Sequence, residues 1–393
     1  MMILVINCGS TSIKYELFAD LESITEGEVG DIGEPDSYVS HTVNGKEVTE
    51  ERSTNDHHDG MGVVLEHVTH GDHGQLEDSE EITAVGHRVV HGGELAEPRV
   101  IDDSVKKTIE EYASVAPLHN PVNLEGIRAL EAHLPDTPQV AVFDTAFHQT
   151  MPPEAYLYAL PYEYYEIHDI RRYGFHGISH AYVAERACEL LDQPVEQTNV
   201  VTCHLGGGCS VAAVERGQSV DTSMGFSPLE GIVMATRTGD VDPTVVQYLV
   251  ESVGMDLEEV FDVFNEDSGL AGLSGISGDM RDLLTAREKG DERADLAIRT
   301  FAYSVKQRIG AFAATLGEVD AIVFTAGIGE NAPLVRELAG DVSVLGAKVD
   351  SEKNEAVAGE PGIISTDTSA TDVLVVPTDE ERRIARQTAA LVE

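Results

Sequence analysis

The chain has 393 residues, with 70 acidic and 26 basic side chains and a formal net charge of −44. This length can fill two domains, and 42% hydrophobic residues is ordinary for a globular protein, which excludes a small disulfide-stapled module and wholesale disorder. Because so negative a surface repels nucleic-acid backbones and anionic lipid, we expect small-molecule partners, no nucleic acid and no membrane.

The acidic excess also bears on the solvent that the protein needs. A chain of this charge should repel itself in dilute buffer. Molar salt relieves such repulsion, because the Debye length falls to roughly 3 Å at 1 M. We therefore expect a halophilic source, although a generally acidic surface would give the same composition.

The cysteines and the N-terminal residues indicate the compartment. Four cysteines occur without the CxxC spacing of a zinc site: Cys8, Cys188, Cys203 and Cys209. The first residues, MMILVINCGS, carry no basic segment, and no apolar stretch approaches the about 18 residues of a membrane span. We expect a reduced, cytoplasmic protein.

A strand, a tight turn and a returning strand open the chain. Residues 3–6 are a buried apolar run, 7–12 are rich in Gly and Ser, and 13–18 alternate. Further along, residues 61–68 have helical spacing, 82–90 and 139–143 read as strands, and a helix begins at Asn120 with Pro121 in its first turn.

The same unit recurs in the middle of the chain. Residues 199–204 form a second apolar run that leads into Gly206–Gly208, and residues 210–214 return from it. One copy in each half predicts a duplicated α/β fold whose two domains face each other across a cleft. The proline- and tyrosine-rich residues 151–165 mark the boundary, so we expect an N-terminal domain of 1–148 joined by 379–393, and a C-terminal nucleotide-binding domain of 149–378.

The second half continues the alternation of helices and strands. Residues 243–252, 257–265 and 295–316 are expected to be helical, and 321–324 and 373–376 to be buried strands. A last helix follows Pro377, with Thr378 or Asp379 as its cap.

Two turns are candidates for phosphate binding. In Asn7–Lys14, hydroxyls and backbone N–H groups crowd a turn that ends in a lysine, which suits phosphate oxygens. In His204–Gly208, three glycines would let a ligand approach the backbone closely. The alternatives are a plain hairpin turn for the first segment and a flexible turn for the second. Neither segment alone establishes phosphate binding.

A third glycine loop, residues 324–332, follows a strand and fits GxGxx(G/A). It raises the alternative of an NAD-dependent dehydrogenase, in which Asp350 would bind the ribose hydroxyls. The loop arrives too late for the remaining β-α repeats of such a domain, so we favour adenosine binding by another fold.

Three arginines and two aspartates are candidates for a binding site. Arg88 ends a buried strand and Arg237 lies among small and apolar residues; each could bind a phosphate or carboxylate, or form a structural ion pair. Asp279 and Arg281 are more ambiguous, because an aspartate after a glycine is also an ordinary helix cap. Asp144 ends a strand, where α/β proteins place ligands, with a helix cap as the alternative.

Histidines divide into two groups. His119 and His176 lie in short irregular segments, which favours a chemical role. A denser group lies in polar sequence on both sides of a short amphipathic helix, so we expect a solvated face and no metal tract: His57, His58, His67, His70 and His73.

Taken together, these residues resemble the acetate kinases over essentially the full length. The segments that carry the resemblance occur in the family's order: NCGSTSIK, HRVVHGG, PLHNP, FDTAFHQTMP, YGFHGISH, HLGGG, MGFSPLEGIVMATRTGD, SGDMRDL, FTAGIGENA and PTDEE. The resemblance implies an actin-like duplicated ATPase fold, a homodimer, and reversible phosphoryl transfer between ATP and acetate that depends on Mg²⁺, with Mn²⁺ as a substitute.

The resemblance also implies roles for particular residues. Catalytic groups would be Arg88, Asp144, His176 and Arg237, and the metal would be held by Asn7 and Glu380. Nucleotide contacts would come from Ser10, Ser12, Lys14, His204, Gly206, Gly207, Gly208, Asp279, Met280, Arg281, Gly327, Ile328, Gly329 and Asn331. The acid substrate would meet Arg88, Val90, Leu118, His119, Phe175 and Pro228.

One residue departs from the family pattern. Acetate kinases commonly carry Asn where this chain has Gly207, and the related butyrate kinases carry glycine. MGFSPLEG and PLHNP favour the acetate branch, while propionate and butyrate remain alternative substrates.

Overall fold

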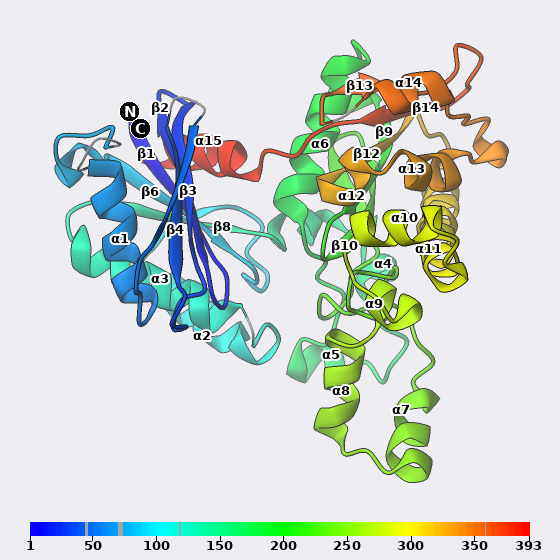
Figure 1. Cartoon of the computed structure of the whole chain (residues 1–393), viewed down its shortest axis with the longest axis horizontal. Helices are drawn as coiled ribbons and strands as arrows, with labels where there is room; N and C mark the ends of the chain where they lie inside the picture. Colours follow the sequence, from blue (N-terminus) through cyan, green and yellow to red (C-terminus); the bar gives the residue numbers. More distant parts are fainter. Residues whose placement is uncertain (44–45, 70–73, 118, 358) are drawn as a thin grey trace. The chain divides into compact units, whose positions relative to one another are not determined.

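The computed structural model describes residues 1–43, 46–69, 74–117, 119–357 and 359–393. The chain divides into two compact units: unit 1 holds Met1–Gln149 and Asp379–Glu393, and unit 2 holds Thr150–Thr378. Each unit is built on one mixed β-sheet with helices packed on it (Figure 1), which confirms the predicted α/β class.

Unit 1 contains an eight-stranded sheet in the order β5-β4-β3-β2-β1-β6-β8-β7. The strands are β1 (Met2–Cys8), β2 (Ile13–Ala19), β3 (Glu22–Gly30), β4 (Tyr38–Val43), β5 (Lys46–Glu51), β6 (Ala84–Val89), β7 (Arg99–Val100) and β8 (Gln139–Phe143). β1 pairs antiparallel with β2 and parallel with β6, and β6 pairs parallel with β8. Strands β3, β4 and β5 were not predicted.

Helices cover both faces of this sheet. They are α1 (His57–Thr69), α2 (Asp103–Glu111), α3 (Asn120–His133) and α15 (Glu380–Val392). Val85 of β6 belongs to a core with Met61 of α1 and Leu130 of α3. The next residue, Gly86, faces the other way, and a Cβ there would lie only 2.5 Å from Thr388 of α15. The last helix therefore packs closely on the face opposite α1 and α3.

Unit 2 contains a six-stranded sheet in the order β11-β10-β9-β12-β14-β13. The strands are β9 (Asn199–Leu205), β10 (Cys209–Glu215), β11 (Gln218–Thr222), β12 (Ala321–Thr325), β13 (Gly362–Ile363) and β14 (Asp372–Val375). β9 pairs antiparallel with β10 and parallel with β12, and β12 pairs parallel with β14. This repeats the order and sense of β2-β1-β6-β8, so the predicted duplication is confirmed.

The helices of unit 2 are α4 (Pro153–Tyr156), α5 (Glu163–His168), α6 (Gly177–Leu190), α7 (Thr244–Tyr248), α8 (Leu257–Asn265), α9 (Gly269–Ser274), α10 (Met280–Glu288), α11 (Glu292–Leu316), α12 (Ala326–Asn331), α13 (Pro333–Gly340) and α14 (Ser351–Ala356). Helix α6 packs on β9 and β12, and α11 packs on β9 and β10. The helix expected over 243–252 is α7 followed by a π-helical turn, Leu249–Val253.

None of the helices in the described residues combines the length and hydropathy needed to cross a lipid bilayer. All four cysteines are buried free thiols.

Candidate active site

The first predicted phosphate turn joins β1 to β2. Cys8 pairs with Ile13 at the end of the ladder, and the N–H of Gly9 donates to the carbonyl of Ser12 at 2.8 Å. Ser10 is exposed and Ser12 is half-buried, so their hydroxyls lie at the surface of the turn. Lys14 is exposed and pairs with Asn7 across the two strands.

Two side chains that the sequence analysis did not assign to the site brace this turn. His57 Nε2 lies 2.8 Å from the carbonyl oxygen of Gly9, and Asn123 Nδ2 donates to the carbonyl of Cys8 at 3.1 Å. Asn123 also accepts the N–H of Val90 at 3.1 Å, so it ties the end of β1 to the end of β6. The expectation that His57 lies on a solvated face is wrong, because its side chain is buried under the turn.

Two other histidines of this group have local contacts. His67 Nδ1 lies 2.9 Å from the carbonyl of Val63, and the His58 ring lies against His133. His70 and His73 lie outside the described residues.

Unit 1 brings Arg88, Asp144 and Glu380 together. Arg88 donates through Nε and Nη2 to the two carboxylate oxygens of Asp144, at 3.1 and 2.7 Å, and its Nε lies 3.4 Å from Glu380. The Asp144 side chain is 2% exposed and the Glu380 side chain 10%. Arg88 therefore forms the structural ion pair that the sequence analysis gave as one of its two interpretations.

The charges in this group influence one another. Burial raises the pKa of Glu380 above its ordinary value, while the cations of Arg88 and Lys14 act to lower it. Burial disfavours the charge of Arg88, but the carboxylates of Asp144 and Glu380 raise its pKa overall. One guanidinium therefore faces two carboxyl groups.

The second predicted phosphate turn joins β9 to β10 in unit 2. Leu205 pairs with Cys209, and the N–H of Gly206 donates to the carbonyl of Gly208 at 3.1 Å. A Cβ on Gly208 would lie 3.3 Å from His176 Nε2 and 3.4 Å from Arg237 Nη1, so these two nitrogens border the space that this glycine leaves open. Around Gly207 no atom of the described residues lies within 4 Å of such a Cβ.

His176 and His204 lie side by side at this turn. Their rings stack with centroids 4.1 Å apart, and His204 Nδ1 lies 2.8 Å from the hydroxyl of Ser179. His176 caps the start of α6 in a left-handed backbone conformation with φ 57°. Of the described residues, no carboxylate forms an ion pair with Arg237; burial lowers its pKa, and its Nη1 donates to the carbonyl of Pro228 at 3.1 Å.

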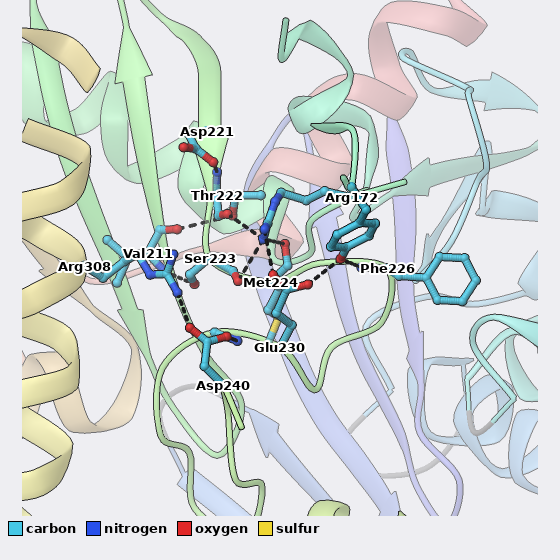
Figure 2. Close-up of polar contacts among 12 residues, drawn as sticks. Arg172, Val211, Asp221, Thr222, Ser223, Met224, Phe226, Glu230, Asp240 and Arg308 are labelled. Atoms are coloured by element: carbon cyan, nitrogen blue, oxygen red, sulfur yellow. Dashed lines mark hydrogen bonds and ion pairs between the residues drawn. The ribbon is translucent and has the colours of Figure 1, made fainter. Parts of the chain in front are cut away.

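The loop that carries Pro228 and Arg237 is held at both ends, as Figure 2 shows. Arg172 donates to Glu230 at 2.6 Å and to three consecutive carbonyls, the first that of Thr222 at 3.2 Å. At the other end, Asp240 accepts from Arg308 at 2.6 Å. These residues position the loop, and the sequence analysis did not identify them.

The third glycine loop is itself helical. Residues 326–331 form α12, because the Glu330 carboxylate accepts the N–H of Ala326 at 2.8 Å and thus satisfies a donor at the start of the helix. Gly327 and Asn331 are exposed, while Ile328 and Gly329 are buried. The dehydrogenase alternative finds no support here: β10 and β11 make the sheet mixed, and Asp350 caps α14.

The ambiguity at Asp279 is resolved as a helix cap. Its carboxylate accepts the N–H of Arg281 at the start of α10, and the Arg281 guanidinium pairs with it at 2.5 Å. The side-chain and backbone hydrogen bonds from Arg281 lower the pKa of Asp279 to about 2. Arg281 itself remains 88% exposed, and Met280 is buried.

The residues expected to contact the acid substrate are divided between the units. Val90 and His119 are half-buried in unit 1, Phe175 is buried and Pro228 half-buried in unit 2. Leu118 lies outside the described residues.

A group of carboxylates that the sequence analysis did not single out lies at the start of α15. Oxygens of Glu16, Asp379 and Glu381 lie within 4.8 Å of one another. Burial and the neighbouring carboxylates of Glu381 and Asp379 raise the pKa of Glu16 to about 7. The group concentrates negative charge on one part of unit 1.

Comparisons with known proteins agree along the whole chain. Residues 2–386 match the family model described as Acetokinase family. The acetate kinase of Thermoanaerobacterium thermosaccharolyticum is 52% identical over 100% of this chain and 99% of its own length, and that of Halothermothrix orenii is 53% identical over 100% of both. Among solved structures, Porphyromonas gingivalis acetate kinase matches with a TM-score of 0.94 at 43% identity, covering 100% of both chains. A propionate kinase from Francisella tularensis matches with a TM-score of 0.93 at 38% identity, covering 99% of both.

Proposed function

This chain belongs to the acetokinase family and is a kinase, and we propose that it transfers the γ-phosphoryl group of ATP reversibly to acetate, giving acetyl phosphate and ADP. Its fold is the duplicated actin-like α/β fold. The observation that carries the proposal is the convergence of His176 Nε2 and Arg237 Nη1 on the open space at Gly208. Two hydrogen-bond donors at a glycine turn suit the oxygens of a phosphoryl group.

The chemistry of a carboxylate acceptor explains why the proposed site needs cations. An acetate carboxylate is already ionised at neutral pH, so a general base has no proton to remove. The barrier is the repulsion between that anion and the triphosphate. Positive groups that neutralise charge as it moves to the leaving oxygen are therefore what direct in-line transfer requires.

We assign the roles by unit. In unit 2, Arg237 and His176 would donate to the transferring phosphoryl group, and His204, Gly206, Gly207 and Gly208 would hold nucleotide phosphates. The adenosine would meet residues at the start of α10 and within α12: Asp279, Met280, Arg281, Gly327, Ile328, Gly329 and Asn331. Unit 2, Thr150–Thr378, would thus be the nucleotide-binding domain.

In unit 1, Arg88 would bind the acid, and Asp144 fixes the orientation of its guanidinium through two hydrogen bonds. The hydroxyls of Ser10 and Ser12 and the ammonium of Lys14 would bind phosphate oxygens at the first turn. This assignment is supported by their exposure at the end of the β1–β2 hairpin.

We propose that Asn7 and Glu380 of unit 1 hold a divalent cation. Asn7 and Glu380 offer an amide and a carboxylate oxygen, which are ligands that Mg²⁺ and Mn²⁺ prefer. The excess of carboxylates over cations at Arg88, Asp144 and Glu380 supports a further positive charge there. When bound, the ion would supply charge neutralisation for the nucleotide phosphates.

Propionate is the second candidate acceptor. The structural likeness to a propionate kinase, with a TM-score of 0.93, favours it as a further substrate. We propose that Val90, Leu118, His119, Phe175 and Pro228 select short acids. One methylene changes binding by only about 1–3 kcal/mol, so propionate should react more slowly than acetate and still react.

We also propose a homodimeric, cytoplasmic enzyme from a salt-rich environment. Large apolar side chains are exposed along two segments of unit 2, namely Leu160, Tyr162, Tyr164 and Ile167, and Tyr248, Val253, Leu257 and Phe261. Exposed apolar patches of this kind mark protein interfaces, which supports a second copy as the partner. The net charge of −44 supports the salt requirement.

Trapping of the product tests the function. The full-length protein is incubated with MgATP, acetate and hydroxylamine in molar KCl, and acetyl hydroxamate is measured. We expect product with acetate, less with propionate, and at least about 10²-fold less from Arg237→Ala. Absence of hydroxamate from a protein that binds ATP would contradict the proposal, and binding of NADH in place of ATP would favour a dehydrogenase.

A further inference from the structure

A row of buried hydroxyls and imidazoles ends at His176. Thr202 Oγ1 lies 2.7 Å from His180 Nδ1, His180 Nε2 lies 2.7 Å from Ser210 Oγ, and Ser210 Oγ lies 2.9 Å from His176 Nδ1. Thr202, His180 and Ser210 are fully buried, with 0% exposure. The sequence analysis singled out His176 and gave no role to the other three.

Regular secondary structure places these four residues in line. His176 and His180 are four residues apart at the start of α6, so they lie on one side of that helix. Thr202 faces α6 from β9, and Ser210 faces it from the neighbouring position on β10, which pairs with His204. The row is therefore held by a helix and two central strands.

The open end of the row is the space at Gly208. His176 uses Nδ1 toward Ser210, and its Nε2 lies 3.3 Å from the position of a Cβ on Gly208, next to Arg237 Nη1. Under the proposed function an anionic phosphoryl oxygen occupies that space. A neutral imidazole can donate a hydrogen bond to this oxygen only with a proton on Nε2, because an unprotonated nitrogen would repel the oxygen with its lone pair.

Each hydroxyl has one proton to donate, so the row can run in one of two directions. If Ser210 donates to His176 Nδ1, then His180 Nε2–H donates to Ser210 and Thr202 donates to His180 Nδ1. In the reverse direction His176 donates from Nδ1, and it can then offer a proton from Nε2 only as a cation.

Two groups beside His176 disfavour the cation. Arg237 is a positive charge near Nε2, and the His204 ring stacks on His176 at 4.1 Å. On β10, burial raises the pKa of the Cys209 thiol to about 12, so this thiol is neutral. These contacts favour the neutral form of His176, and with it the first direction of the row.

We propose that Thr202, His180 and Ser210 are positioning residues that hold His176 as a neutral imidazole with its proton on Nε2, aimed at the transferring phosphoryl group. This inference rests on the proposed function. Thr202 lies three hydrogen bonds from His176, so its hydroxyl would influence the rate without contact with substrate.

A spectroscopic measurement on the unmodified protein tests the tautomer. The full-length protein is labelled with ¹⁵N in its histidine rings, and the His176 signals are assigned by their loss in His176→Gln. We expect the neutral Nε2–H form at neutral pH. A neutral Nδ1–H form or a doubly protonated ring would overturn the proposal, whether or not any variant folds.

Matched variants test the influence on the rate. We expect Ser210→Ala and His180→Leu to lower kcat by about 10–100-fold, with KM for acetate and for MgATP changed by less than about threefold. His180→Gln should retain most of the rate, because its amide N–H takes the place of Nε2–H toward Ser210. Equal losses in His180→Gln and His180→Leu, or an unchanged kcat in Ser210→Ala, would overturn the proposal.

Thr202→Val removes the far hydroxyl with almost no change of shape. We expect kcat to fall several-fold and the His176 tautomer to become mixed. Thr198→Val is the control. It also removes a buried hydroxyl, which lies just before the same strand and donates to the carbonyl of Pro194 at 2.8 Å. An equal effect of both variants would overturn the proposal. The NMR measurement needs no turnover, so a wild-type protein without kinase activity would contradict the proposed function alone.

Discussion

The two turns that close β1–β2 and β9–β10 occupy equivalent places in the duplicated fold and present different chemistry. The first spans Gly9–Ser12 and offers hydroxyls and a nearby lysine from its own sequence. The second spans Gly206–Gly208 and offers bare backbone, with His176 and Arg237 brought to it from elsewhere in the chain. The backbone unit is therefore the same in both copies, while each copy has its own set of polar groups at the turn.

The principal arginines of the two units differ in the same way. Arg88 is held by Asp144 and Glu380, so its charge is compensated and its orientation fixed. Arg237 donates to the carbonyl of Pro228, and its pKa is lowered by burial. The first arginine is part of a structural ion pair as well as a candidate ligand, whereas the second retains its charge for an incoming anion.

Removal of each arginine should give the largest effects and separate these two roles. We expect Arg88→Ala and Arg237→Ala each to lower kcat/KM by at least about 10²-fold in the hydroxamate assay. Only Arg88→Ala should also destabilise the fold, by about 3 kcal/mol, because it leaves the buried Asp144 carboxylate unpaired.

Urea unfolding in molar KCl measures the stability difference. Arg88→Lys serves as a control that keeps the charge and loses the two-point geometry. Equal unfolding midpoints for Arg88→Ala and Arg237→Ala would show that the ion pair between Arg88 and Asp144 does not stabilise the fold.

Neighbouring glycines in the second turn should differ in their tolerance of a methyl group. Gly208→Ala places a Cβ 3.3 Å from His176 Nε2 and fills the space where its donor meets that of Arg237. We expect kcat to fall by about 10–100-fold, since misplacement of catalytic groups by less than about 1 Å is costly. Gly207→Ala should lower kcat by less than Gly208→Ala, because its Cβ would meet no group of the described residues within 4 Å beyond its chain neighbours. Similar losses in both variants would contradict this geometry.

The smallest effect concerns the carboxylates of unit 1. Glu16 has a folded-state pKa of about 7, above its ordinary value of 4.5, so its contribution favours the folded state at low pH and is lost as the pH rises through 7. Glu16→Gln should therefore stabilise the protein at pH 8 by about 1 kcal/mol in dilute buffer, after allowance for solvent screening. Below about pH 5 the advantage should vanish.

Thermal unfolding at both pH values, with and without molar KCl, checks this expectation. Salt should shrink the difference, because it screens the repulsion from Glu381 and Asp379. The exposed Glu34, changed to Gln, is the matched control in the same unit. A wild-type Tm that declines as KCl rises would contradict the proposed salt requirement.

Local sequence was sufficient where a pattern was contiguous. Strand β8 and helix α8 have the predicted bounds of 139–143 and 257–265, since an apolar run and a helical period are signals within one element. Asp379 caps α15, as one of the two predicted candidates. Strands β3, β4 and β5 were missed because their sequence is polar, and every residue of β5 is exposed.

The sequence by itself determined the duplicated strand–turn–strand units, the α/β class and most of the chemically active residue types. Only the tertiary structure decided which of these residues meet. Arg88 and Asp144 are 56 residues apart in the chain, and Asn123 reaches Cys8 across 115. Such contacts arise when sheet order and helix packing bring distant segments together. A local sequence pattern does not show which distant residues will meet. The same reason hid His57, Arg172 and the hydroxyl row at His176, whose roles depend on partners supplied by other elements.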